Sequence, residues 1–234
     1  MKLIFVRHGD PLRESFSISQ KGINESILLG ELLTNLNIDG FYSGTTDRAT
    51  ETAEIISARS RNKKIIKLGW LNEFKHEIEL PDGQKQFPWE LSSDLWCTSQ
   101  MLDREKCMMS NMFKSGEIKK YAYELWENID MFLTKKGYIR TGNVYNVIRG
   151  NSECHVFVSH FATISVLLSH LLNIPLPIML NGFWMAPSSY TTLVTEEIEK
   201  GKAIFRCINY GETKHLHLHN DLMSNYGLQI EYRD

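Results

Sequence analysis

Cysteine is scarce in this sequence, and no two cysteines lie close together. The chain has 234 residues and four cysteines, Cys97, Cys107, Cys154 and Cys207, with no C-x-x-C pair. A zinc knuckle, a thiol redox motif and a disulfide framework are therefore not predicted. Reduced thiols in a cytosolic protein are the simplest interpretation.

The chain also lacks a strong excess of charge and a long apolar run. The formal net charge is -2, so nothing attracts nucleic acid or an anionic membrane globally, and any anion site must come from local Arg and His residues. The most apolar region, 156–180, contains two histidines and two prolines, which would be costly in lipid. The first apolar run ends at Arg7, which is too short for a signal peptide. We therefore expect a cytoplasmic protein that binds neither nucleic acid nor membrane.

Short apolar strands alternate with amphipathic helices along most of the chain. Strands are predicted over 2–6, 40–43, 64–68, 155–159, 190–195 and 203–208, and helices over 21–35, 48–59, 118–136 and 162–172. With no repeat or linker, this alternation predicts one α/β domain over 1–234, a three-layer α/β/α sandwich with a mostly parallel sheet.

The middle of the chain departs from this alternation. Residues 81–116 are rich in Trp, Met and Pro without a clean period, and a long amphipathic helix follows. We predict a helical insertion or lid over 75–145 within the domain. Its Trp and Met cluster packs the insertion onto the core, lines an apolar substrate pocket or forms the face of a homodimer.

Cationic and imidazole side chains directly follow two of the predicted strands. Arg7 and His8 come after the first strand, and His160 ends V-F-V-S-H. Arg48 begins a helix after Y-S-G-T-T-D, so its guanidinium and the helix N-terminus both suit one anion. Because sites in such sheets gather at the carboxyl ends of strands, we expect these four side chains to meet there.

These residues resemble the histidine phosphatase superfamily, also called phosphoglycerate mutase-like. The resemblance lies in V-R-H-G at His8, I-S-Q-K-G, Y-S-G-T-T-D-R-A-T-E-T-A around Arg48, and V-F-V-S-H at His160. It implies that His8 is transiently phosphorylated and that Arg7, Arg48 and His160 bind the phosphoryl oxygens. It also implies the superfamily's fold, an acidic residue that protonates the leaving group, and no cofactor or metal.

Glu73 in L-N-E-F is the first candidate for that acid, because similar phosphatases carry their catalytic carboxyl after the third strand. Glu77 is the reserve, and Asp10 and Asp82 remain as alternatives. A proton donor needs a raised pKa, which burial beside aromatic neighbours would provide.

The chain departs from the pattern of the superfamily at several positions. Phe161 stands where most relatives have Gly, and Pro11 and Glu14 replace two neutral polar residues after R-H-G. Phe161 would narrow the pocket or shift the following helix, while Gly9 and Arg13 are further candidate substrate contacts.

The sequence thus predicts a metal-independent phosphomonoesterase of the histidine acid phosphatase type, acting on a small phosphorylated substrate. Attack on phosphorus needs a neutral His8, whereas His160 would bind the phosphoryl group better as a cation. A phosphoglycerate mutase-type transferase and a catalytically weak phosphate-binding module remain as alternatives.

A run of alternating histidines near the end of the chain has no place in this scheme. His215, His217 and His219 would share one face of a strand and could ligate zinc or nickel. No carboxylates accompany them, so a solvated edge segment is the favoured interpretation and no metal site is predicted.

Overall fold

The computed structural model describes residues 1–12, 15–60, 64–218 and 223–228, and its centre is an eight-stranded sheet in the order β3-β2-β8-β1-β9-β10-β7-β6. These strands are β1 (Lys2–Arg7), β2 (Gly40–Ser43), β3 (Ile65–Lys67), β6 (Tyr138–Thr141), β7 (Val144–Val147), β8 (Cys154–Ser159), β9 (Tyr190–Glu199) and β10 (Lys202–Glu212). The helices are α1 (Gln20–Leu33), α2 (Asp47–Arg59), α3 (Ser93–Trp96), α4 (Asn111–Ser115), α5 (Ile118–Lys135), α6 (Phe161–Leu171), α7 (Leu176–Asn181) and α8 (Lys214–His217). Over the described residues, no helix is both long and apolar enough to cross a membrane.

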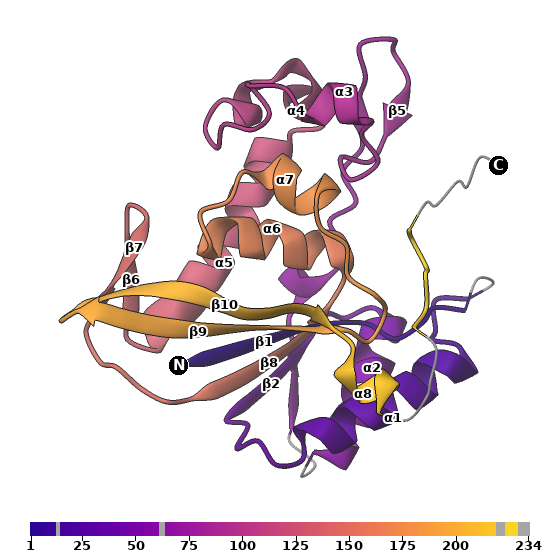
Figure 1. Ribbon diagram of the computed structural model, residues 1–234, viewed down its shortest axis with the longest axis vertical. Helices are drawn as coiled ribbons and strands as arrows, with labels where there is room; N and C mark the ends of the chain where they lie inside the picture. The colour runs from indigo at the N-terminus through magenta and orange to yellow at the C-terminus, as the bar shows by residue number, and fades with distance from the viewer. Residues whose placement is uncertain (13–14, 61–63, 219–222, 229–234) are drawn as a thin grey trace.

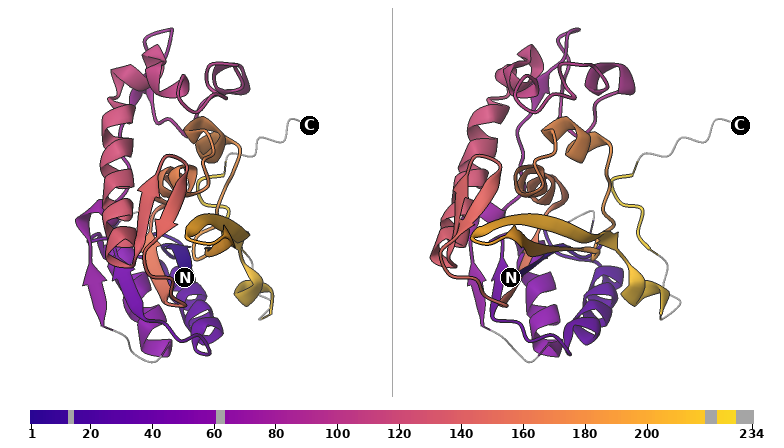
Figure 2. Two further views of the ribbon diagram at one scale, coloured as in Figure 1. Left: turned by 90° about the vertical axis from the view of Figure 1, so that its left-hand side faces the viewer. Right: turned by 60° about the vertical axis from the view of Figure 1, so that its left-hand side comes forward.

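Helices cover both faces of this sheet, which makes three layers. Side chains alternate along β1, so Leu3 and Phe5 join the cluster that includes α5 and α6, whereas Ile4 and Val6 join the cluster that includes α1 and α2. Figure 1 shows α1 and α2 below the sheet and α5, α6 and α7 above it, and Figure 2 shows the same layers from two other sides. The predicted α/β/α sandwich is confirmed.

The two halves of the sheet differ in strand direction. The half that ends in the predicted site is parallel: β1 pairs with β8, β8 with β2, and β2 with β3. The other half is antiparallel, because β9 and β10 form a long hairpin beside β1, and the β6–β7 hairpin adds to its edge. Parallel strands need long crossover connections, so helices connect the strands of the parallel half. Tight turns join the strands within each antiparallel hairpin.

The interval 75–145 contains more than helices. It begins with the small hairpin of β4 (Ile78–Glu79) and β5 (Lys85–Gln86) and continues through α3, the 3-10 helix Cys107–Met109 and α4 to α5. Figure 1 shows β5, α3 and α4 gathered at the top of the molecule, away from the sheet. Its last residues form β6, which joins the central sheet; the tight turn at Gly142, with φ of 61°, reverses the chain into β7.

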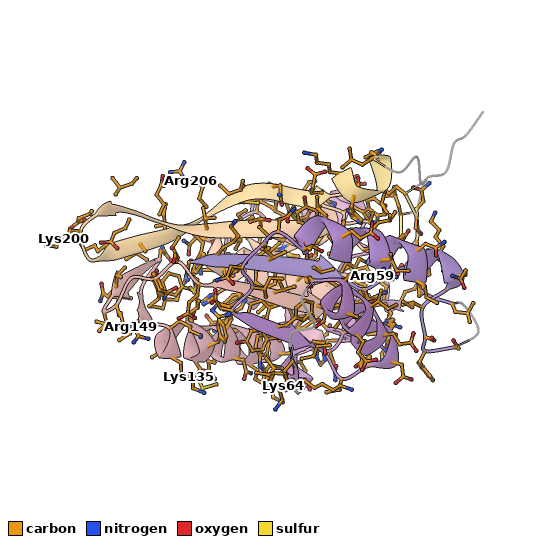
Figure 3. The ribbon with its side chains drawn as sticks, turned by 90° about the horizontal axis from the view of Figure 1, so that it is seen from below. Arg59, Lys64, Lys135, Arg149, Lys200 and Arg206 are labelled. Atoms are coloured by element: carbon orange, nitrogen blue, oxygen red, sulfur yellow. The ribbon has the colours of Figure 1, made fainter. Side chains whose placement is uncertain are left out.

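Exposed cations are spread around the molecule instead of gathering over one element. Figure 3 labels six of them, all exposed and carried by different elements and loops: Arg59, Lys64, Lys135, Arg149, Lys200 and Arg206. The two arginines predicted to bind an anion differ from these because they lie at the carboxyl end of the parallel strands.

Candidate active site

His8 and His160 lie side by side because β1 and β8 are neighbours in parallel register. Arg7 at the end of β1 pairs with Ser159 at the end of β8, so the next residue in each chain segment is one of the two histidines. Their ring centroids are 5.0 Å apart, with the ring planes at 62°. This geometry confirms the prediction that the two histidines lie close together.

The hydrogen bond made by the His8 ring fixes which nitrogen is free. Its Nδ1 lies 2.8 Å from the carbonyl oxygen of Gly9, and because that oxygen only accepts, Nδ1 carries the proton. Nε2 is then left with its lone pair. Burial, followed by the charges of His160, Arg7 and Arg48, holds the pKa of His8 well below its ordinary value. The imidazole is therefore neutral, as a nucleophile must be.

Close packing against α1 requires a glycine at position 9. A Cβ on Gly9 would lie 2.8 Å from the carbonyl oxygen of Gly22 in α1, which is closer than real Cβ contacts. The Gly9 amide donates to Thr52 Oγ1 at 2.9 Å. Gly9 thus lets the loop after β1 lie against α1, and it does not line the cleft described below.

His160 is neutral in this structure, contrary to the expectation of a cation. Burial and the charges of Arg48, Lys75 and Arg7 lower its pKa to about 3. Its Nδ1 accepts from Arg48 Nε at 3.3 Å, so the proton resides on Nε2, which donates to Thr46 Oγ1 at 3.1 Å. Thr46 precedes α2 as expected for an N-cap, but its side chain makes no cap hydrogen bond. The hydroxyl orients His160 instead.

Arg7 is buried between two aromatic rings. Its Cζ lies 5.8 Å from the ring centroid of Phe161 and 5.8 Å from that of Tyr226, and its Nη1 donates to the carbonyl oxygen of Met185. Burial lowers its pKa to about 10, so the guanidinium remains charged at neutral pH. Phe161 therefore does more than narrow the pocket, because a ring over a guanidinium adds a cation–π attraction that holds Arg7 in place.

Glu73 joins this group, and its environment favours the protonated form. Its Oε2 is 3.6 Å from His160 Nδ1, and its side chain is 15% exposed. Burial raises the pKa of Glu73, and the charges of Arg48 and Arg7 offset only part of that rise.

The loop that carries Glu73 is fixed by hydroxyl groups on both sides. Ser159 Oγ donates to the carbonyl oxygen of Leu71 at 2.6 Å, and Thr163 Oγ1 donates to that of Asn72 at 2.6 Å. The Asn72 side chain in turn accepts from the amide of Thr45 at 2.7 Å. These bonds lock the residue preceding Glu73 against β8, α6 and the start of α2. Sequence reasoning missed them, since the partners are far apart along the chain.

The other acidic candidates lie elsewhere. Glu77 is exposed and is not among the residues that line the cleft, and Asp82 is exposed in the turn between β4 and β5. Asp10 accepts hydrogen bonds from Ser19 Oγ at 2.7 Å and from Ser224 Oγ. Arg13 and Glu14 lie outside the described residues.

A cleft of about 320 Å³ opens over this group. It is lined by Arg7, His8, Arg48, Glu73, Phe87, Trp89, Glu90, Phe161, Ala162, Trp184, Tyr226 and Gly227. Five of these residues are aromatic. Sequence reasoning did not identify Phe87, Trp184 or Tyr226 as site residues, because they come from the insertion, from the loop after α7 and from the segment 223–228.

A buried carboxyl lies behind the site. Glu25 on α1 is fully buried, and its Oε2 accepts from the Asp10 amide at 3.1 Å. Burial raises the pKa of Glu25 from 4.5 to about 7. The folded protein therefore keeps this proton at pH values where the unfolded chain has lost it.

The pKa of Glu25 makes the stability of the fold pH-dependent. Because the folded pKa is the higher one, its contribution is fully present below about pH 4.5 and is lost as the pH rises to about 7, a change of about 3 kcal/mol. Glu25→Gln should therefore raise the free energy of unfolding at pH 8 and change it little at pH 4.5, as measured by urea denaturation. Glu31→Gln, an exposed change on the same helix, is the control. An advantage of Glu25→Gln that is equal at both pH values would contradict this assignment.

The alternating histidines do not form a strand. His215 and His217 lie in the short helix α8, where His215 is buried and His217 is exposed, so they do not share a face. His219 lies outside the described residues. Within the described part of the chain, no group of three or more His, Cys, Asp or Glu side chains is placed to hold a metal ion.

Comparisons with known proteins agree with this arrangement. Residues 3–80 match the model of the histidine phosphatase superfamily (branch 1), whereas no curated protein matches the sequence. An Entamoeba histolytica phosphoserine phosphatase solved with 3-phosphoglyceric acid is 16% identical, with a TM-score of 0.59 over 92% of this chain and 98% of that chain.

Two further solved structures share the fold. A mycobacterial glucosyl-3-phosphoglycerate phosphatase with VO3 is 18% identical, with a TM-score of 0.57 over 89% of this chain and 98% of that chain. A putative alpha-ribazole-5'-P phosphatase from Escherichia coli is 18% identical, with a TM-score of 0.55 over 90% and 98% of the two chains. Residues 3–80 thus match the histidine phosphatase superfamily, and the chain as a whole shares the fold of these solved phosphatases.

Proposed function

We propose that this protein is a metal-independent phosphomonoesterase that works through a phosphohistidine on His8. The observation that carries the proposal is the His8 ring, which is neutral, has its proton on Nδ1, and lies 5.0 Å from His160 beside two arginines. This arrangement suits in-line attack on a phosphoryl group, whose charge in the transition state is spread over its equatorial oxygens.

In the first step, His8 Nε2 attacks phosphorus and the ester P–O bond breaks. Arg7 and Arg48 bind the phosphoryl oxygens, and Glu73 gives its proton to the departing alkoxide oxygen. His160 is neutral in the structure, but an incoming phosphoryl dianion beside it would raise its pKa. It then changes from a neighbour oriented by Thr46 and Arg48 into a further donor to the phosphoryl group.

In the second step, water attacks the phosphorus of phosphohistidine and inorganic phosphate leaves. Glu73, now a carboxylate, takes a proton from the water, and the imidazole of His8 is restored. The alternation of one carboxyl between acid and base is the expected consequence of running the two half-reactions at one site. The named activities of the three solved neighbours, each a phosphatase, support hydrolysis over transfer to a second hydroxyl.

The test is phosphate release from a panel of phosphomonoesters, including 4-nitrophenyl phosphate, at pH 5.5 and pH 7 with a chelator present. Turnover that survives the chelator is the expected result. A mutase would release phosphate slowly and would instead transfer the phosphoryl group to an added phosphoglycerate. A binding module would release no phosphate.

A further inference from the structure

The cleft has two chemically different parts. His8, Glu73 and the two arginines line the cleft at the carboxyl ends of the parallel strands, where the phosphoryl group binds in the proposed reaction, and His160 lies buried beside them. The rest of the lining is built by other segments and is mainly aromatic. We call the five residues Phe87, Trp89, Phe161, Trp184 and Tyr226 the aromatic wall.

Two members of the aromatic wall, Phe87 and Trp89, are stacked face to face. The rings of Phe87 and Trp89 are stacked with centroids 4.5 Å apart and planes at 2°. Both side chains are half-buried, whereas Pro88 between them is buried. They therefore project together from the turn 87–90, in which the Glu90 amide donates to the Phe87 carbonyl oxygen at 3.0 Å, and the outer face of the stacked pair is a flat apolar surface.

This surface is held rigidly against α7. Asn181 at the end of α7 donates from Nδ2 to the carbonyl oxygen of Pro88 at 3.0 Å and accepts at Oδ1 from the amide of Leu91 at 3.1 Å. The carboxyl of Glu90 accepts from the amide of Phe87 at 3.3 Å. A fixed plane loses little entropy on binding a second plane.

The charges of the lining argue against an acidic leaving group. Arg7 and Arg48 are the cations among the described lining residues, and both are needed for the phosphoryl oxygens. Lys75 is exposed and is not part of the lining. Glu90 instead places a carboxylate beside the aromatic wall, so a second negative charge on the substrate would be repelled.

We propose that the preferred substrate is an aromatic phosphomonoester whose ring carries no negative charge and stacks on the aromatic wall, next to Glu90. This inference rests on the proposed function. It separates the chain from proteins that accept acidic leaving groups, such as the neighbour solved with 3-phosphoglyceric acid.

The test compares substrates that differ in ring shape but not in the reactivity of the leaving alcohol. Benzyl phosphate and cyclohexylmethyl phosphate are both esters of primary alcohols, but only the first has a planar ring. We expect kcat/KM to be about tenfold higher for benzyl phosphate. Equal values for the two esters would overturn the proposal.

Variants test whether the aromatic wall causes the preference for benzyl phosphate over cyclohexylmethyl phosphate. Trp89→Leu should remove most of the tenfold preference by lowering kcat/KM for benzyl phosphate, while Tyr123→Leu, a change on the exposed side of α5, should preserve it. A loss that is equal for both esters would indicate a general defect and contradict a stacking role for Trp89.

Charge is tested with ring-substituted esters. Wild-type protein should turn over 4-(aminomethyl)benzyl phosphate faster than 4-carboxybenzyl phosphate, and Glu90→Gln should improve the latter about fivefold. Glu79→Gln, an exposed change on β4, should not. Preference of wild type for the carboxylated ester would overturn the proposal.

Failure of the proposed function is distinguishable from failure of this inference. Benzylphosphonate and cyclohexylmethylphosphonate cannot be hydrolysed, so their Kd values, measured by calorimetry, report the cleft alone. If no ester is hydrolysed but benzylphosphonate binds about tenfold more tightly than cyclohexylmethylphosphonate, the aromatic wall recognises planar rings as proposed, whereas the proposed phosphatase activity is rejected. Equal Kd values would reject the wall.

Discussion

A His8→Ala protein is expected to lose turnover of every phosphomonoester that the wild type hydrolyses, by roughly 10⁴- to 10⁶-fold. The reason is structural: the bond from His8 Nδ1 to the Gly9 carbonyl presents Nε2 to the cleft, and no other side chain among the described lining residues offers an unprotonated nitrogen there. His160 does not substitute, because its Nδ1 accepts from Arg48 and its Nε2 donates to Thr46.

The phosphoenzyme can be observed directly. Wild-type protein quenched during turnover of a ³²P-labelled ester should carry a label that is stable in alkali and lost in acid, as expected for a P–N bond. His8→Ala should carry none, and His217→Ala, an exposed change on α8, should be labelled like wild type. A label in His8→Ala, or turnover that persists in a variant with native circular dichroism, would eliminate His8 as the nucleophile.

Glu73→Gln should lower kcat by about 10²- to 10⁴-fold for an alkyl phosphate and much less for 4-nitrophenyl phosphate. An alkoxide leaves only if it is protonated as the bond breaks, whereas nitrophenolate leaves without a proton. A similar loss on both esters would mean that Glu73 acts in some other way.

The pH profile gives a second readout for the same residue. Because burial raises the pKa of Glu73, the protonated acid persists to higher pH than for an ordinary Glu, and kcat/KM for the alkyl ester should fall as the pH rises through that pKa. In Glu73→Gln, kcat/KM should not show this fall, which is the alkaline limb of the pH profile. Glu77→Gln, whose side chain is exposed outside the cleft, should retain both the rate and the limb.

Sequence patterns identified the elements that carry the phosphoryl end of the site. The strand 40–43 was predicted at its observed bounds, and those at His8 and His160 to within a residue, because apolar runs followed at once by charged or imidazole groups have few alternatives. The same reasoning missed the β6–β7 hairpin, since each of its short strands buries a single side chain, Tyr138 or Tyr145, and therefore shows no apolar period.

The protonation states of the site residues and the contacts between distant segments were harder to predict from the sequence. The neutral state of His160 in the absence of a phosphoryl group was not expected, because its complete burial and the adjoining Arg48 become visible only once the layers are assembled. The aromatic wall draws on four segments separated by many residues, and nothing in the local sequence relates Trp89 to Tyr226. Local periodicity describes elements, and it says little about which side chains meet across them.

The central position of β1 bears on how this protein folds. β1 lies between β8 and β9, so residues 2–7 find their partners only near residues 154–159 and 190–194. Contacts of such long sequence separation require large loops to close, which slows folding and favours late formation. We therefore expect the helices and the β9–β10 hairpin to form before β1 inserts. Since Arg7 and His8 end β1, catalytic competence would be among the last properties that the chain acquires.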